Sequence, residues 1–268
     1  MSVQTTVATP RRERRALSLR DRDRILSIVS PIGLLLVWEL AARAGFIDTR
    51  FFPAPSAVLA LLIEMLKSGE LLTHTGKSLQ RLVWGTVIGG VPALVLGIVM
   101  GLNRTIRALV DPIIAATYPI PKSSILPLAL LIFGLGESSK IFMVAIGVFF
   151  PVAINATTGV LEINKIYLDV GRNYKADRWS MFWTIALPGA LPVIMTGFKL
   201  GIGIGLILIA IAEMIGAKSG LGFLIWSAWE TFAVEQMYVG LFMIALIGFT
   251  LTVALNELER IIIPWKSS

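Results

Sequence analysis

The sequence predicts an all-α integral membrane protein with six transmembrane helices. Of its 268 residues, 56% are hydrophobic and only 15% are charged, whereas a soluble domain carries about a quarter charged residues. The apolar residues fall into long runs, most of them of the length that a helix needs to cross a bilayer. These two observations exclude an ordinary soluble domain.

The distribution of basic residues predicts the orientation of the chain. The formal net charge is +7, but 15 of the 24 Lys and Arg lie in the N-terminal tail, in alternate connections between the spans and near the C-terminus. The positive-inside rule places such segments in the cytoplasm, so we expect both termini there and no nucleic-acid partner. Cysteine is absent, which excludes disulfides. The single histidine, His74, is expected on a solvated external connection, and no metal site is expected.

The first part of the chain combines a basic tail with an apolar run. Residues 1–24 are rich in arginine and are expected to be a disordered cytoplasmic tail. The run 25–42 predicts the first transmembrane helix. A cleaved signal peptide is the alternative, because Ala42-Arg43-Ala44 resembles a cleavage site. Residues 25–75 then hold this span and an external interfacial helix that begins at Ser56, as N-cap, and ends at Lys67.

Residues 76–260 are expected to form the main bundle. The second span, 82–102, contains Gly85/Gly89 and Gly97/Gly101, the small-residue spacing that lets helices approach closely in lipid. Three further spans are expected at 141–160, 191–211 and 238–255, with a connection at 213–236 and a cytoplasmic C-terminal anchor at 261–268.

The third apolar region, 106–133, is interrupted by proline. Pro119-Ile120-Pro121-Lys122 cannot continue a regular helix. Irregular backbone at membrane depth survives only where it is buried in protein or lines a cavity. Pro119, Pro121 and Lys122 are therefore candidates for a translocation path or gate, and the alternative is a break at the membrane surface.

A polar segment of about residues 160–188 separates the fourth and fifth spans. Apolar residues recur at helical spacing on both sides of Asn173–Lys175, which predicts two short amphipathic helices joined by a turn. The exposed mixed surface suits a soluble partner, and a plain solvated loop is the alternative.

This segment resembles the cytoplasmic signature loop of ABC-importer permeases. Asp169-Val170-Gly171 matches the first triplet of that pattern, and Ile185-Ala186-Leu187-Pro188 matches its end at the expected distance. Lys175 stands where the pattern has glycine, which suits a positive φ, so either the turn differs here or Lys175 adopts a strained conformation.

The resemblance extends over most of the chain and indicates the sulfonate/nitrate/taurine branch of ABC importers. The residues that carry it are Pro53-Ala54-Pro55-Ser56, Ser78-Leu79-Gln80-Arg81, Asp111-Pro112, Pro119-Ile120-Pro121, Phe133-Gly134-Leu135-Gly136, Phe149-Phe150-Pro151, Leu187-Pro188, Thr196-Gly197-Phe198-Lys199-Leu200, Ala212-Glu213-Met214 and Gly220-Leu221-Gly222.

The resemblance implies a type I, MetI-like permease bundle with a cytoplasmic coupling-helix loop in the bacterial inner membrane. It also implies a second copy of the chain, two ABC ATPase subunits, a periplasmic solute-binding protein and membrane lipid as partners. No cofactor is expected in this chain, which is not itself an enzyme; ATP and Mg are expected on the ATPase. The residues expected to dock the ATPase are Asp169, Val170, Gly171, Arg172, Lys175, Ala176, Leu187 and Pro188.

Two charges at membrane depth are further candidates for the path. Lys199 and Glu213 lie near one face of the fifth span, and intramembrane charges are commonly functional. A cation there suits an anionic sulfonate or nitrate. Alternatively, Lys199 reaches the cytoplasmic interface and Glu213 lies at the outer rim.

Two other classes of protein remain open from the sequence. An ion-gradient-driven secondary transporter would usually show repeats with broken helices in both halves, and only one broken region is evident here. A non-transport assembly protein would not require the cytoplasmic signature loop.

Overall fold

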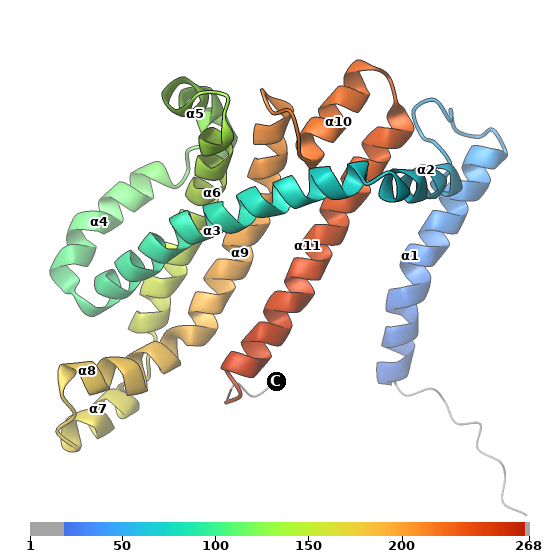
Figure 1. The fold of residues 1–268 in the computed structure, drawn as a ribbon. Coiled ribbons are helices and arrows are strands. Elements are labelled where there is room, and N and C mark those ends of the chain that lie inside the picture. The colour runs from blue at the N-terminus through green and yellow to red at the C-terminus, as the bar shows by residue number, and fades with distance from the viewer. Residues whose placement is uncertain (1–18, 266–268) are drawn as a thin grey trace, which may run out of the picture. The chain divides into compact units, whose positions relative to one another are not determined.

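The computed structural model describes residues 19–265, except for the side chains of residues 19–25, 27, 28, 165, 168, 172 and 178. The described residues are mainly helical, with short turns between the helices and no strand among them (Figure 1). They divide into two compact units, up to Ser56 and from Ala57 onward.

The first unit is built on α1 (Leu19–Arg43). This helix begins inside the segment that we predicted to be a disordered tail; residues 1–18 lie outside the described residues. Some side chains of α1 are also outside that set, so its role as a sixth span stays a prediction. Near its end, Glu39 accepts hydrogen bonds from the Ser56 backbone amide (2.9 Å) and hydroxyl (2.7 Å). We predicted that Ser56 is the N-cap of the interfacial helix. This prediction is wrong, because α2 (Pro55–Lys67) begins one residue before Ser56.

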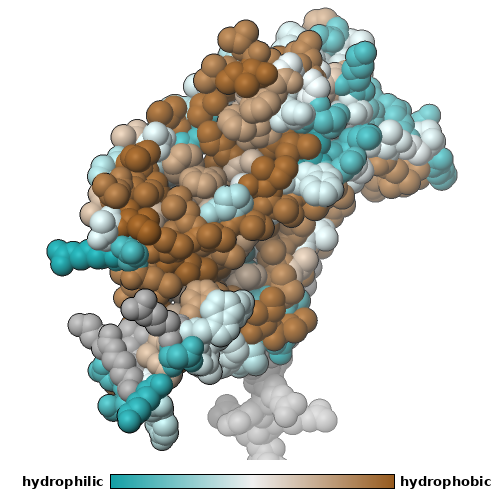
Figure 2. Space-filling view, turned by 60° about the vertical axis from the view of Figure 1, so that its left-hand side comes forward, coloured by the Kyte–Doolittle hydropathy of each residue, from teal (hydrophilic) through white to brown (hydrophobic). Residues whose placement is uncertain are grey.

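Four helices of the described residues are long and apolar enough to cross a membrane, and a bent pair makes a fifth candidate. The four are α3 (Glu70–Leu102), α6 (Glu137–Leu161), the run of α8 (Arg178–Met181) and η2 (Phe182–Ala186) into α9 (Leu187–Met214), and α11 (Val234–Ile262). Many of their large apolar side chains are exposed. Figure 2 shows a broad apolar surface of the kind that faces lipid.

Three of these helices, α3, α6 and α9, pack side by side as the centre of the bundle. The predicted small-residue pairs of α3 are confirmed as contact points. A Cβ on Gly85 would lie 2.4 Å from Val144 Cβ, and one on Gly97 would lie 2.5 Å from the Ala153 carbonyl oxygen. Only hydrogen fits at these positions, so the glycines set the distance between the helices.

The same arrangement brings α9 onto the other side of α6. A Cβ on Gly197 would meet Asn155 Cβ at 2.7 Å, and one on Gly201 would meet Val148 at 3.1 Å. Val148 and Val152 of α6 are fully buried. Helix α6 is thus enclosed by its two neighbours over most of its length.

The helix that contains the predicted second span, 82–102, begins earlier than that span. Helix α3 begins at Glu70, and polar residues of its first turns have partners in the fold. His74 is not a free surface residue: its Nδ1 accepts a hydrogen bond from the Gly220 amide (3.0 Å), and its ring stacks on Phe223.

The predicted connection at 213–236 is also more ordered than expected. It contains a further helix, α10 (Leu221–Glu230), whose Leu221, Leu224 and Ile225 are buried. Leu221 and Leu224 pack in a cluster with Val239 and Met243 of α11.

Replacing Gly89 by Ala is predicted to destabilise the bundle. The new Cβ would lie 2.1 Å from the Ala145 carbonyl oxygen, a backbone atom that cannot rotate away. We expect a loss of about 1–3 kcal/mol, seen as a lower melting temperature in detergent.

Gly76 of the same helix is the matched control, because nothing lies within 4 Å of its added Cβ. Gly76→Ala should raise stability by about 0.5–1 kcal/mol. Equal effects of the two substitutions would contradict the packing argument.

Candidate functional site

The segment between α6 and α9 forms a helical elbow of α7 (Lys165–Asn173), α8 (Arg178–Met181) and η2 (Phe182–Ala186). The predicted first amphipathic helix is confirmed as α7. Asn164 begins it by accepting a hydrogen bond from the Ile166 amide (3.0 Å). We predicted a second short helix that is separate from the fifth span. Instead, η2 is a π-helical turn that joins α8 directly to α9.

The turn after α7 settles the question raised by Lys175. Its φ is +52°, so a lysine occupies the left-handed conformation in which glycine is favoured. The Ala176 amide donates to the Gly171 carbonyl oxygen (3.0 Å), the long-range hydrogen bond of a Schellman helix end. The chain thus keeps the glycine-type turn at a conformational cost of about 1 kcal/mol.

The inner face of α7 rests on the start of the fifth span. Gly171 is buried, and a Cβ there would lie 2.7 Å from Ile185 Cδ1 and 2.8 Å from Met181 Cε. Ile163, just before α7, packs in one cluster with Ala186 and Ala190. A displacement of α7 must therefore push on the residues that lead into α9.

The outer face of α7 is apolar and open. Tyr167, Val170 and Tyr174 are exposed by 63%, 47% and 85%, and they lie on one side of the helix at spacings of three and four residues. In the second half of the elbow, Trp179 and Trp183 are also exposed and stack edge to face at 5.5 Å. Such an aromatic surface at a polar end of a membrane bundle is typical of a protein contact.

Other residues predicted for docking have different environments. Asp169 is exposed and Ala176 is partly buried. Leu187 and Pro188 are partly buried at the junction of η2 with α9, where they support the elbow from within. The Arg172 side chain lies outside the described residues.

Asp177 caps the second half of the elbow. Its carboxylate accepts from the Ser180 hydroxyl and from the backbone amides of Trp179 (3.2 Å) and Ser180 (3.3 Å). The hydroxyl of Ser180 and these amides hold the pKa of Asp177 below its ordinary value. The cap is therefore present above the pKa of an unfolded Asp and is lost as the pH falls through the lowered value.

The proline-rich break also forms as predicted. Helix α4 (Arg104–Thr117) ends before Pro119, and η1 (Lys122–Ile125) with α5 (Leu126–Phe133) continues at an angle of 88°. Lys122 Nζ donates to the carbonyl oxygens of Thr117 (3.0 Å), Tyr118 (2.9 Å) and Ile120 (3.0 Å).

Lys122 also lies 4.1 Å from the centre of the Phe150 ring of α6. The ammonium group of Lys122 donates hydrogen bonds to carbonyl oxygens that the helix break leaves without a helical partner. Its contact with the Phe150 ring holds the break against α6. Whether Pro119, Pro121 and Lys122 line a path stays a prediction.

Glu213 is fully buried in a polar network at the end of α3 opposite Leu102. It accepts from Arg81 Nη1 (2.8 Å), from the Ser78 hydroxyl (2.7 Å) and from the Gly222 amide (3.0 Å). Arg81 is 2% exposed and also binds Glu137 of α6, through Nε at 2.6 Å. The network ties α3, α6 and α9 together, which is the structural role that these contacts support.

Lys199 pairs with the last span. Its Nζ donates to Glu259 and to Asn256 Oδ1 (2.5 Å), both of α11. The two charges of α9 thus have different surroundings, since Lys199 is partly exposed and Glu213 is enclosed. A substrate role for either stays a prediction.

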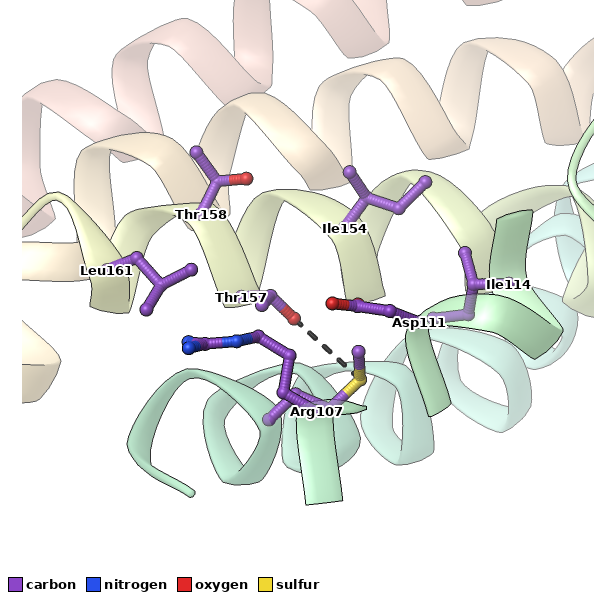
Figure 3. A pocket seen from close by; sticks show the side chains of 8 residues that line it. Arg107, Asp111, Ile114, Ile154, Thr157, Thr158 and Leu161 are labelled. Carbon is purple, nitrogen blue, oxygen red and sulfur yellow. Dashed lines mark hydrogen bonds between the residues drawn. The ribbon is translucent and has the colours of Figure 1, made fainter. Parts of the chain in front are cut away.

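A hollow of about 220 Å³ lies between α4 and the second half of α6. Arg107, Asp111 and Thr157 face it (Figure 3). The sequence singled out none of these as a site, because α4 and α6 are far apart along the chain. The available signal was the pair of opposite charges one turn apart at 107 and 111.

Replacing Lys175 by Gly is predicted to stabilise the elbow, because glycine adopts φ +52° without strain. Amide hydrogen exchange at residues 171–177 should slow by about fivefold, which corresponds to about 1 kcal/mol.

Lys218→Gly is the control, since Lys218 is exposed but has no positive φ. It should leave the exchange of residues 171–177 unchanged. Faster exchange in Lys175→Gly would show that the turn depends on the lysine side chain.

Replacing Glu213 by Gln is predicted to cost about 3–5 kcal/mol of folding stability, since the buried Arg81 loses one of its two carboxylates. The melting temperature of the purified chain measures this loss. Glu64→Gln on the exposed side of α2 is the control and should change it little. A similar small effect at Glu213 would refute the structural importance of the network.

Comparison with known proteins identifies the family. Residues 93–268 match the family described as binding-protein-dependent transport system inner membrane component. The taurine transport system permease protein TauC of Escherichia coli is 36% identical over 253 residues, which cover 91% of each chain. SsuC of Escherichia coli, named for aliphatic sulfonate transport, is 36% identical over 88% of this chain and 90% of its own. The nitrate import permease protein NrtB of Synechocystis is 28% identical over 98% of both chains.

These matches run through the bundle and the elbow together. Membership of this family implies a multi-pass protein of the inner membrane that works with an ATPase and a solute-binding protein. The chain belongs to the binding-protein-dependent transport system inner membrane components, as a permease subunit of the sulfonate, nitrate and taurine branch of ABC importers.

Proposed function

We propose that this chain forms the translocation path of an ATP-driven importer for a small anionic solute and couples that path to a separate ATPase through the elbow. The observation that carries the coupling role is the exposed apolar face of α7, formed by Tyr167, Val170 and Tyr174. The substrate class rests on the names of the relatives, which cite taurine, aliphatic sulfonates and nitrate.

The proposed assembly contains two copies of this chain, two ATPase subunits and a periplasmic solute-binding protein. Each copy would contribute six spans, with α1 as the first, in a MetI-like arrangement with both termini in the cytoplasm. The concentration of basic residues at the elbow and in the N-terminal tail supports this orientation. ATP and Mg would bind on the ATPase.

The contacts of the elbow suggest how movement is transmitted. ATP binding would close the two ATPases and draw the two α7 helices together. Gly171 presses directly on Met181 and Ile185, and those residues belong to the continuous helical run that becomes α9. A shift of α7 would therefore tilt α9, and with it α6, to open the path outward. Hydrolysis would restore the inward state.

Replacing Val170 by Glu is predicted to uncouple the ATPase. A carboxylate in the centre of the exposed apolar face would lose its water on docking and would find no positive charge to pair with. We expect transport-linked ATP hydrolysis in the reconstituted complex to fall at least tenfold, while the chain still folds and forms its dimer.

Phe232→Glu is the matched control, because Phe232 is 84% exposed and lies beyond α10, at the other end of the bundle from the elbow. It should leave the coupling intact. Equal loss in both variants, or none at Val170, would argue against docking on α7.

The experiment that tests the function is uptake into proteoliposomes that contain this chain, its ATPase and its binding protein. Labelled ethanesulfonate, 2-aminoethanesulfonate and nitrate are supplied as substrates. Uptake of at least one that requires ATP and the binding protein is expected. Uptake driven by an ion gradient without the ATPase would instead indicate a secondary transporter.

A further inference from the structure

The last span, α11, is held by the bundle in two different ways along its length. In its first half, Val239, Met243 and Ile247 are buried in one apolar cluster with residues of α2, α3 and α10. Gly248 continues this contact toward α9, because a Cβ there would lie 3.2 Å from Leu206 Cδ2. The first half of α11 is therefore fixed by close apolar packing.

The second half of α11 has a different surface. From Phe249 to Ile262 most of its side chains are exposed, and those turned toward the bundle recur at every fourth position. Leu251 and Leu255 are the partly buried members of this row, and Glu259 is its buried member. A carboxylate thus stands where an apolar side chain would continue the row. Burying it costs free energy unless it is paired.

Lys199 of α9 supplies the pairing. Its ammonium group donates to the Glu259 carboxylate and to Asn256 Oδ1 (2.5 Å), so both of its partners lie on α11. The side chains of Lys199 and Glu259 are only 25% and 12% exposed. Their attraction is therefore screened less by water than that of a surface ion pair. We call Lys199, Asn256 and Glu259 the α9–α11 clasp.

The clasp joins α11 to the part of α9 that leads out of the elbow. Lys199 lies about 18 Å along the helix from Leu187, at about 1.5 Å per residue. Between these two residues, Ala190 and Ile194 are buried in a cluster with α6 and the start of the fifth span. In the described part of the chain, no member of that cluster comes from α11. Hence the clasp connects the second half of α11 to a segment with which it shares no apolar core.

We propose that the α9–α11 clasp makes the second half of α11 follow α9 when the elbow moves, while the packed first half of α11 serves as the pivot. Lys199, Asn256 and Glu259 are then positioning residues of the transport cycle, because they act through the placement of α11. Two N–H groups of the ammonium are needed for the two partners on α11. This inference rests on the proposed function and extends the movement of the elbow from α9 to the last span.

A distance measurement at the end of α11 tests the proposal. The chain has no cysteine, and Ile261 is 75% exposed, so Ile261→Cys gives one spin label per copy. Pulsed electron paramagnetic resonance on the importer reconstituted with its ATPase and binding protein compares the nucleotide-free state with ATP bound under non-hydrolysing conditions. The label-to-label distance should change on ATP binding. An unchanged distance in a complex that transports would overturn the proposal.

Glu259→Gln, added to the labelled chain, removes the charge of the clasp and keeps the size of the side chain. Lys199 then keeps access to water at its exposed part, so the chain should still fold. We expect loss of the ATP-dependent change in distance and about fivefold less solute transported per ATP hydrolysed. A lower melting temperature with both readouts unchanged would make the clasp only structural and overturn the proposal.

Exchange of the two charges separates coupling from a loss of stability. Lys199→Glu combined with Glu259→Lys re-forms the ion pair with its charges reversed. The exchange should restore the change in distance and the transport per ATP that each single substitution removes. A folded double variant that stays as uncoupled as the single variants would overturn the proposal.

Glu257→Gln is the matched control on the same helix. Glu257 lies 4.0 Å from Arg260 of α11 itself, and its side chain is 63% exposed, so it does not join α11 to α9. This variant should leave the distance change and the transport per ATP as in the wild type. Losses equal to those of Glu259→Gln would show a general charge effect and overturn the assignment to the clasp.

Failure of this inference is distinguishable from failure of the proposed function. If the complex shows ATP-driven uptake but the labels at residue 261 do not move, the clasp has no coupling role and the importer function stands. If the complex with ATPase and binding protein shows no ATP-driven uptake, the importer function falls and this inference falls with it.

Discussion

The close approach of α3, α6 and α9 is the constraint on which the rest of the structure depends. Glycine at the crossing points allows the backbone of α6 to touch its neighbours, with no room even for a methyl group at Gly89. In lipid, where apolar burial does not drive helices together, this van der Waals contact replaces the hydrophobic effect. Helix α6 is consequently held on both sides and moves only together with α3 and α9.

The functional features lie at the two ends of this three-helix unit. At one end, the buried Arg81 pairs with both Glu137, which is exposed at the start of α6, and Glu213, which is buried at the end of α9, so that one cation stabilises two carboxylates. At the other end, the elbow is pressed against the start of α9 through Gly171. The hollow with Arg107 and Asp111 borders the same last turns of α6.

The sequence predicted the features that depend on local chemistry. Paired glycines on α3 and the prolines at 119 and 121 have direct consequences for packing and helix continuity, and both appear as expected. Features that depend on distant partners were not predicted. The first turns of α3 looked too polar for a span because the partners of His74 lie in the segment before α10. The hollow likewise exists only where α4 meets α6.

The central claim is that ATP binding moves the elbows, and a distance measurement tests it most directly. The chain has no cysteine, so Asn173→Cys gives one spin label per copy at the exposed end of α7. Pulsed electron paramagnetic resonance then reports the label-to-label distance in the reconstituted importer. The account predicts a shorter distance when ATP is bound under non-hydrolysing conditions than in the nucleotide-free state. An unchanged distance, in a complex that still transports, would contradict it.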